Sequence, residues 1–324
     1  MWRIIAVSLF VVWTSTPAAA EWFWINKNSS DKLIVFVHGL RGDPKESFKG
    51  GERSWPELMA ADTERVRASP ALSTYSIALV GYPAGGGNRL NLREIAYRLL
   101  VELDDGAVLD QYKDVIFITH SLGGLVIKDL LVAARKDNYP ISKKVAAVFL
   151  IAVPSKGTPA AEWALKLFSE PLMEDLKPID VNSYLQALDD DWNSLVAKRD
   201  ARRPRVFCAY ERQPTLGVTV LPIVYSYTHC DERPWAENKD HFAIVKPPSV
   251  GDSMYGWVRG RIASLYQSGA NPQPTPVPPT GPKEVREPPK SLDPITNSVT
   301  EKAYASLMSY ARSVIVSKSN WRDN

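Results

Sequence analysis

Short runs of apolar residues recur along the chain, separated by stretches with the spacing of amphipathic helices. Residues 33–37, 115–118 and 206–210 are such runs. Continuous runs are typical of strands buried on both faces, whereas half-exposed strands alternate apolar and polar residues. The pattern therefore predicts an α/β fold with a mainly parallel central sheet and helices on both faces. With 324 residues and 45% hydrophobic content, the chain can bury one large core.

The turn after the second run carries a serine in a distinctive setting. Residues 119–124 read Thr-His-Ser-Leu-Gly-Gly and lead into an apolar stretch, residues 125–131, that fits a buried helix. A strand, a sharp turn with one serine and a helix form the nucleophile elbow of serine hydrolases. Ser121 is therefore the candidate nucleophile, with Gly123 as one of the small neighbours that a tight turn needs. Thr119 stands where glycine or alanine is usual, so an ordinary strand-to-helix turn is the alternative.

A second motif lies upstream, where the first apolar run ends in His38, Gly39 and Leu40. An oxyanion hole needs two convergent backbone N–H groups. In hydrolases with this order of motifs, one comes from the residue after the nucleophile and one from a His-Gly loop. The predicted donors are the N–H groups of Leu122 and Leu40. A His-Gly pair alone marks only a strand-ending turn, but two motifs in the expected order favour a hydrolase.

The general base must be one of four histidines. In this type of hydrolase the chain order is serine, acid, histidine, which excludes His38 and His120 because both precede Ser121. His241 follows a polar stretch and precedes apolar residues, which suits a loop after the last strand. His229 ends a strand-like run instead. The sequence favours His241 as the base and leaves His229 as a structural histidine.

The acid is less sharply indicated. It normally follows the next-to-last strand, and Glu211 is the first carboxylate after residues 205–210. Asp231 and Glu232 are the alternatives, because they lie beyond the next strand-like run at residues 221–228. The acidic run at residues 189–191 is expected to be solvated surface.

These segments together resemble the serine esterase family of α/β-hydrolases, which includes the eukaryotic serine-active-site-containing proteins and, more distantly, inositol deacylases of lipid anchors. The similar segments are residues 35–40, 81–83, 119–128, 151–159, 210–215 and 240–247. The resemblance implies an α/β-hydrolase fold, with Ser121 as nucleophile and His241 as base. It supports Glu211 as the acid more weakly.

The expected function is cleavage of carboxylic esters, esterase-like or lipase-like, through an acyl-enzyme on Ser121. Two alternatives use the same scaffold. One is an acyltransferase or lipid deacylase with the same three residues, and the other is a catalytically inactive binding protein. A small-molecule or lipid ester is the expected substrate.

Charge and composition exclude several other partners. The net charge is +3 and no run of five or more basic residues occurs, which argues against nucleic acid. The glycines of residues 84–88 do not match a dinucleotide fingerprint, and no cysteine or histidine pair has zinc spacing. We therefore expect no cofactor and no metal. The aromatic residues 21–25 suggest either membrane-surface contact or packing against the first strands.

The N-terminus resembles a secretory signal. Residues 1–3 start with a positive charge, residues 4–13 are apolar and residues 18–20 are alanines suited to cleavage. We expect export to the periplasm or secretion, with an uncleaved membrane anchor as the alternative. Export would permit a disulfide between Cys208 and Cys230, and two free buried cysteines are the other possibility.

The chain divides by composition into four parts. The prediction is a signal peptide at residues 1–20, a catalytic domain at residues 21–268, a proline-rich linker at residues 269–299 and a tail at residues 300–324 with a candidate short helix. Within the catalytic domain, residues 159–203 form a candidate cap over the site.

Overall fold

The computed structural model describes residues 20–266, except 67–68, 85–89, 107, 159–170, 198–202, 216–219, 222–225 and 227. The predicted signal peptide apart from its last residue, the proline-rich linker and the tail lie outside the described residues. Of the candidate cap, residues 171–197 and 203 are described.

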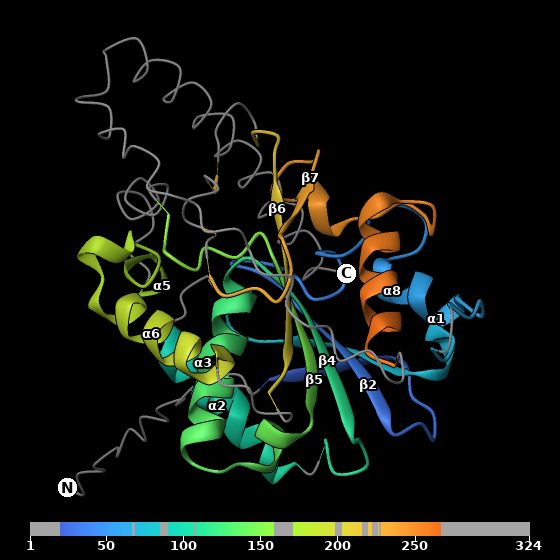
Figure 1. The fold of residues 1–324 in the computed structure, drawn as a ribbon, viewed down its shortest axis with the longest axis horizontal. Helices are drawn as coiled ribbons and strands as arrows, with labels where there is room; N and C mark the ends of the chain where they lie inside the picture. The colour runs from blue at the N-terminus through green and yellow to red at the C-terminus, as the bar shows by residue number, and fades with distance from the viewer. Residues whose placement is uncertain are drawn as a thin grey trace, which may run out of the picture.

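A seven-stranded sheet forms the centre of the molecule (Figure 1), with the strand order β1-β3-β2-β4-β5-β6-β7. β1 pairs antiparallel with β3, and every other pair of neighbours is parallel. The predicted fold class is confirmed. The strands are β1 (Glu21–Asn26), β2 (Lys32–Val37), β3 (Ser76–Gly81), β4 (Asp114–His120), β5 (Val145–Ile151), β6 (Arg205–Glu211) and β7 (Trp235–Glu237).

Helices cover both faces of this sheet. On one side lie α2 (Leu92–Asp105), α3 (Leu122–Lys136) and α6 (Ser183–Ala197), and on the other lie α1 (Trp55–Ala61) and α8 (Ser253–Ser264) (Figure 1). The remaining short helices are α5 (Pro171–Glu174), η1 (Leu72–Thr74), η2 (Pro140–Lys143), η3 (Ile179–Val181) and η4 (Ala243–Val245). None of the helices in the described part of the chain has the length and apolar character needed to cross a bilayer.

The side chains of β2 explain why the central strands read as continuous apolar runs. Val35 and Val37 point into the core under α2, α3 and α6, whereas Ile34 and Phe36 point into the core under α1 and α8. Successive side chains of a strand alternate between faces, so a strand covered on both faces needs apolar residues at every position.

The described part of the candidate cap packs on the face of the sheet that α2 and α3 cover. Leu172 of α5 and Trp192 of α6 are buried in the same core as α3. The aromatic segment at the start of the domain forms the edge strand β1, and Trp22 and Trp24 pack against that core.

The polar stretch before His241, expected to be a loop, contains a short strand. β7 comprises only Trp235, Ala236 and Glu237, and it pairs with the end of β6. It lies in the stretch that the sequence indicates as a loop, because a three-residue edge strand with two exposed residues has no apolar run. Residues 228–230 have no regular structure, and most of residues 221–228 lie outside the described part of the chain.

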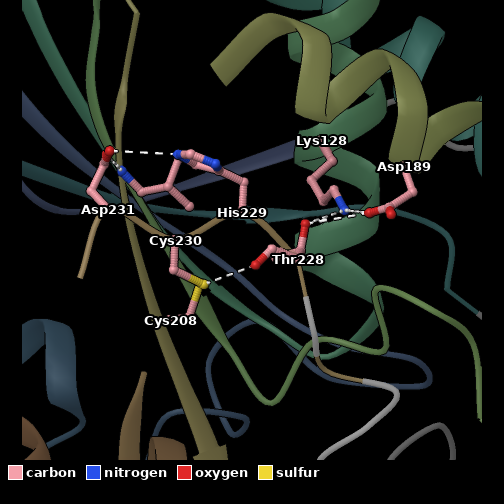
Figure 2. The surroundings of a disulfide bond; sticks show 8 residues. Lys128, Asp189, Cys208, Thr228, His229, Cys230 and Asp231 are labelled. Atoms are coloured by element: carbon pink, nitrogen blue, oxygen red, sulfur yellow. Dashed lines mark hydrogen bonds and ion pairs between the residues drawn. A yellow bond between two sulfur atoms is a disulfide. The ribbon is translucent and has the colours of Figure 1, made fainter. Parts of the chain in front are cut away.

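Cys208 and Cys230 are joined in a disulfide, with a Cα–Cα distance of 5.9 Å (Figure 2). Cys208 lies in β6, and Cys230 lies in the irregular segment at residues 228–230. The next residue, Asp231, holds the same segment to β6 by accepting the N–H of Val206 at 2.7 Å. The disulfide, this charged hydrogen bond and a main-chain hydrogen bond from the Asp231 N–H to the Val206 carbonyl oxygen at 2.8 Å therefore attach residues 228–231 to the strand that ends at Glu211.

Candidate active site

Ser121 lies in the sharp turn between β4 and α3. Its backbone has φ 50° and ψ −126°, a conformation that residues other than glycine rarely adopt. The Ser121 N–H donates to the carbonyl oxygen of Ile151 at 3.0 Å, and the Gly124 N–H donates to the Ser121 carbonyl oxygen at 3.0 Å. The strained turn projects the serine side chain at the carboxyl edge of the parallel sheet, as a nucleophile elbow requires.

The residues around Ser121 are small because the chain segments approach closely. A Cβ atom at Gly123 would collide with the carbonyl oxygen of His38, and one at Gly124 would collide with Val153. Thr119 is buried, and its hydroxyl donates to the carbonyl oxygen of Phe149 at 2.8 Å. A Cβ at Gly124 would lie 3.0 Å from the Thr119 Oγ1 atom. Gly124 thus leaves room for Thr119, which stands where glycine or alanine is usual.

Ser121, His241 and Glu211 form one hydrogen-bonded chain. The Ser121 Oγ lies 3.1 Å from His241 Nε2, and His241 Nδ1 lies 3.0 Å from Glu211 Oε1. Because a carboxylate oxygen only accepts, Nδ1 carries the hydrogen and Nε2 is free to accept from the serine hydroxyl. His241 and Glu211 are each only 6% exposed. Ser121 comes from the elbow, Glu211 from the end of β6 and His241 from the loop before η4.

The other acid and base candidates make different contacts. Arg203 donates hydrogen bonds of 2.6 and 2.9 Å to Asp231. Burial raises the pKa of Asp231, but contacts from His229, Arg203 and the Val206 N–H outweigh burial and hold this pKa below its usual range. Glu232 accepts from Arg261 at 2.6 Å. The structure therefore places Glu211, and neither Asp231 nor Glu232, beside His241.

The two predicted oxyanion donors belong to segments that adjoin Ser121 in sequence or in space. Leu122 is the first residue of α3, so the helix itself does not use its N–H. Gly39 brings the loop of Leu40 against the elbow, since a Cβ at Gly39 would lie 2.9 Å from the Ser121 Cβ. Within the described part of the chain, no backbone acceptor binds the N–H of Leu40 or Leu122.

Tyr82 fixes the loop that contains Leu40. Its hydroxyl donates to the carbonyl oxygen of His38 at 2.7 Å, and the two rings stack with centroids 4.5 Å apart. His38 Nδ1 in turn donates to the Gly39 carbonyl oxygen at 2.8 Å. Burial raises the pKa of the Tyr82 hydroxyl, which keeps it a hydrogen-bond donor. The sequence gives no signal for this contact, because the two residues lie 44 positions apart.

The main chain of His241 is also held by side chains that the sequence does not indicate. His120 Nε2 lies 2.8 Å from the His241 carbonyl oxygen. The His241 N–H donates to Thr215 Oγ1 at 3.1 Å. Both residues are buried.

Lys128 of α3 is completely buried. Its Nζ lies 3.2 Å from Thr228 Oγ1 and 3.5 Å from Asp189 Oδ1 of α6 (Figure 2). Burial lowers the pKa of Lys128 to about 8 although Asp189 opposes this shift. The expectation that residues 189–191 are all solvated is thus wrong for Asp189, which is 8% exposed because it faces the buried ammonium.

The family model for the alpha/beta hydrolase family matches residues 34–281. The chain belongs to this family. Protein SERAC1 of Danio rerio is 23% identical over 251 residues, which cover 68% of this chain and 37% of that protein. The chain of this alpha/beta hydrolase thus spans little more than a third of the length of that relative.

Two solved structures have a similar fold. The mature form of the Bacillus licheniformis lipase BlEst2 is similar with a TM-score of 0.51 and 15% identity, covering 75% of this chain and 98% of that lipase. The propeptide form of the same lipase gives a TM-score of 0.53 at 15% identity, covering 75% of this chain and 53% of that one. These similarities show the alpha/beta hydrolase fold.

Proposed function

We propose that this alpha/beta hydrolase is a serine-dependent hydrolase of carboxylic esters. The observation that carries the proposal is the chain from Ser121 Oγ through His241 to Glu211, with separations of 3.1 and 3.0 Å. A serine hydroxyl is a weak nucleophile until a base takes its proton, and a base works best when a third group fixes its tautomer. All three parts of this requirement are met at one point on the carboxyl edge of the sheet.

In the first step, Ser121 Oγ attacks the carbonyl carbon of the ester while His241 Nε2 takes the hydroxyl proton. The carbonyl electron pair moves onto oxygen, and the N–H groups of Leu40 and Leu122 stabilise the negative charge that develops there. Glu211 remains ionised and stabilises the positive charge on His241. The tetrahedral intermediate then collapses, the alcohol leaves with the proton from Nε2, and the acyl group stays on Ser121.

In the second step, a water molecule takes the place of the alcohol. His241 removes a proton from this water, whose oxygen attacks the acyl carbon. Collapse of the second intermediate returns the proton to Ser121 and releases the carboxylic acid. The lipase named among the structural relatives supports a small-molecule or lipid ester as the substrate class.

We also infer that the protein acts outside the reducing cytosol. The disulfide between Cys208 and Cys230 supports this inference because such bonds persist in oxidising compartments. The signal-like residues 1–20 agree with it. Alkylation of the protein isolated from its native compartment, with and without prior reduction, tests the inference: free thiols before reduction would contradict it.

The proposed activity is tested with p-nitrophenyl esters from acetyl to palmitoyl, comparing the wild-type chain with Ser121→Ala and His241→Ala. We expect hydrolysis by the wild type and loss of activity in both variants. A fluorophosphonate probe should form an adduct on Ser121, identified by mass spectrometry. Labelling of another residue, or undiminished hydrolysis by Ser121→Ala, would overturn the proposal.

A further inference from the structure

His120 occupies the space between the elbow and the loop of His241. It is the last residue of β4 and is 5% exposed. Its Nε2 lies 2.8 Å from the His241 carbonyl oxygen, and the two ring centroids are 4.9 Å apart. Because a carbonyl oxygen only accepts, Nε2 carries a hydrogen and donates it. The contact joins the strand before the proposed nucleophile to the main chain of the proposed base.

Thr215 holds the same residue from the other side. Its Oγ1 accepts the His241 N–H at 3.1 Å, and the side chain is 3% exposed. Both main-chain polar groups of His241 are therefore bonded to buried side chains from two distant parts of the sequence. A ring that must reach Ser121 with one nitrogen and Glu211 with the other tolerates little displacement of its main chain.

We propose that His120 and Thr215 are positioning residues, which hold the main chain of His241 so that its ring spans Ser121 and Glu211. The inference rests on the proposed ester hydrolysis, and it concerns residues that do not touch the substrate themselves.

A neutral histidine suits this role better than a charged donor. Burial lowers the pKa of His120 well below its usual value, and the neighbouring His241, Lys246 and His38 add to this effect. His241 must become positively charged when it takes the serine proton. A second positive charge 4.9 Å away, between ring centroids, would oppose that step, whereas a neutral donor does not.

His120 also lies close to the loop that carries the proposed oxyanion donor. A Cβ at Gly39 would lie 3.2 Å from His120 Nδ1, so a side chain at this position would meet the ring. The ring thus contacts the loop of His241 and lies near the loop of Leu40. A substitution that keeps the side-chain volume but removes the N–H donor therefore distinguishes the effect of the hydrogen bond from the effect of packing.

Four substitutions test the proposal. His120→Gln keeps an N–H donor close to the place of Nε2, and His120→Leu removes it. Thr215→Val removes the acceptor with nearly unchanged shape. Thr74→Val is the matched control, because the Thr74 hydroxyl also binds a main-chain group, the Ala71 carbonyl oxygen at 2.7 Å. Thr74 lies in η1, at the amino end of β3, whereas Ser121 lies at the carboxyl end of β4.

We expect kcat for a p-nitrophenyl ester to fall roughly 10- to 100-fold in His120→Leu and in Thr215→Val, with KM unchanged. The rate of fluorophosphonate labelling at Ser121 should fall by the same factor, which provides a readout even if the ester series contains no good substrate. His120→Gln should recover most of both rates, and Thr74→Val should leave them unchanged. The downfield proton resonance of the His241–Glu211 hydrogen bond should persist in His120→Gln and disappear in His120→Leu.

A folded His120→Leu variant with wild-type kcat and labelling rate would overturn the inference. If that variant does not fold, Thr215→Val decides in the same way. Ser121→Ala separates the two levels of the argument. When Ser121→Ala is inactive and the positioning variants are fully active, only this inference fails, whereas an active Ser121→Ala overturns the proposed function as well.

Discussion

Ser121 carries a positive φ of 50°, which costs a residue other than glycine on the order of 1 to 3 kcal/mol. Such a conformation persists only where the surrounding structure determines it. Here the hydrogen bond from the Ser121 N–H to Ile151 and the close contacts of Gly39 and Gly123 hold the turn. Packing of the strand end, the helix start and the His-Gly loop thus positions the serine before any substrate binds.

The identity of the acid is tested at a single residue. Glu211→Gln replaces a carboxylate with an amide of the same shape, which removes the charge that stabilises protonated His241 and fixes its tautomer. We expect kcat to fall by roughly a thousandfold or more, with little change in KM. Asp231→Asn is the matched control, since Asp231 pairs with Arg203 and does not contact His241. A larger loss of kcat in Asp231→Asn than in Glu211→Gln would reverse the assignment.

The sequence predicts the site residues whose order along the chain and neighbouring motifs are characteristic, but it does not predict the residues that support them through tertiary packing. Ser121, Glu211 and His241 each follow a recognisable strand or motif, and the structure brings them together. Thr215 and Tyr82 bind groups 26 and 44 positions away. No local pattern reports which distant main-chain group a hydroxyl will meet, because the tertiary fold makes that choice.

The same limit applies to elements. The central strands are buried on both faces, so their apolar runs stand out, and β7 does not because two of its three residues are exposed. The close approach of α3 to the segments that follow β2 and β5 gives no apolar pattern either, since it depends on the consecutive glycines of the elbow, which lie against His38 and Val153. Close packing there leaves little space for an added methyl group.

Gly124→Ala tests this close approach. The new Cβ would collide with Val153 and lie 3.0 Å from Thr119 Oγ1, so we expect a loss of about 1 to 3 kcal/mol in the free energy of unfolding. Val153→Ala removes the methyl groups that collide, so the double variant should recover more than half of that loss. Urea denaturation of the single and double variants measures both effects. Strictly additive losses would show that the two positions do not compete for the same space.

The contact between α3 and α6 predicts a pH dependence of stability. Lys128 has a pKa of about 8 in the fold against 10.5 for an ordinary lysine. Below about pH 8 both the folded and unfolded states hold the proton, and burial of the charge weakens the fold in full. Between about pH 8 and pH 10.5, the unfolded state binds more protons than the folded state, because Lys128 is neutral in the fold and charged in the unfolded chain. The contribution of Lys128 to the unfolding free energy therefore rises with pH, by on the order of 3 kcal/mol.

Comparison with Lys128→Met isolates this contribution. From about pH 7 to about pH 10, the wild type should gain stability relative to Lys128→Met, measured by urea denaturation. Lys136→Met is the control, because the exposed Lys136 pairs with Asp191 on the same two helices. Parallel pH profiles for the wild type and Lys128→Met would show that Lys128 is not held in an apolar environment.

At the scale of the whole molecule, we expect the disulfide to contribute to the free energy of unfolding but not to catalysis. Its loop spans 22 positions, for which the lost chain entropy of the unfolded state corresponds to about 3 kcal/mol. Glu211 lies on the same strand as Cys208, but β6 is paired on both sides, with β5 and β7. Removal of the disulfide should therefore lower the free energy of unfolding and leave Glu211 beside His241.

The double variant Cys208→Ser/Cys230→Ser should unfold at lower urea concentration by about 3 kcal/mol and keep the wild-type kcat at room temperature. Wild-type protein treated with a thiol reductant should behave in the same way, which controls for the serines themselves. The hydrogen bonds between Asp231 and Val206 remain in both cases and still hold residues 228–231 to β6. A folded double variant with a greatly reduced kcat would contradict this division, because it would mean that the covalent bond, rather than strand pairing, sets the position of Glu211.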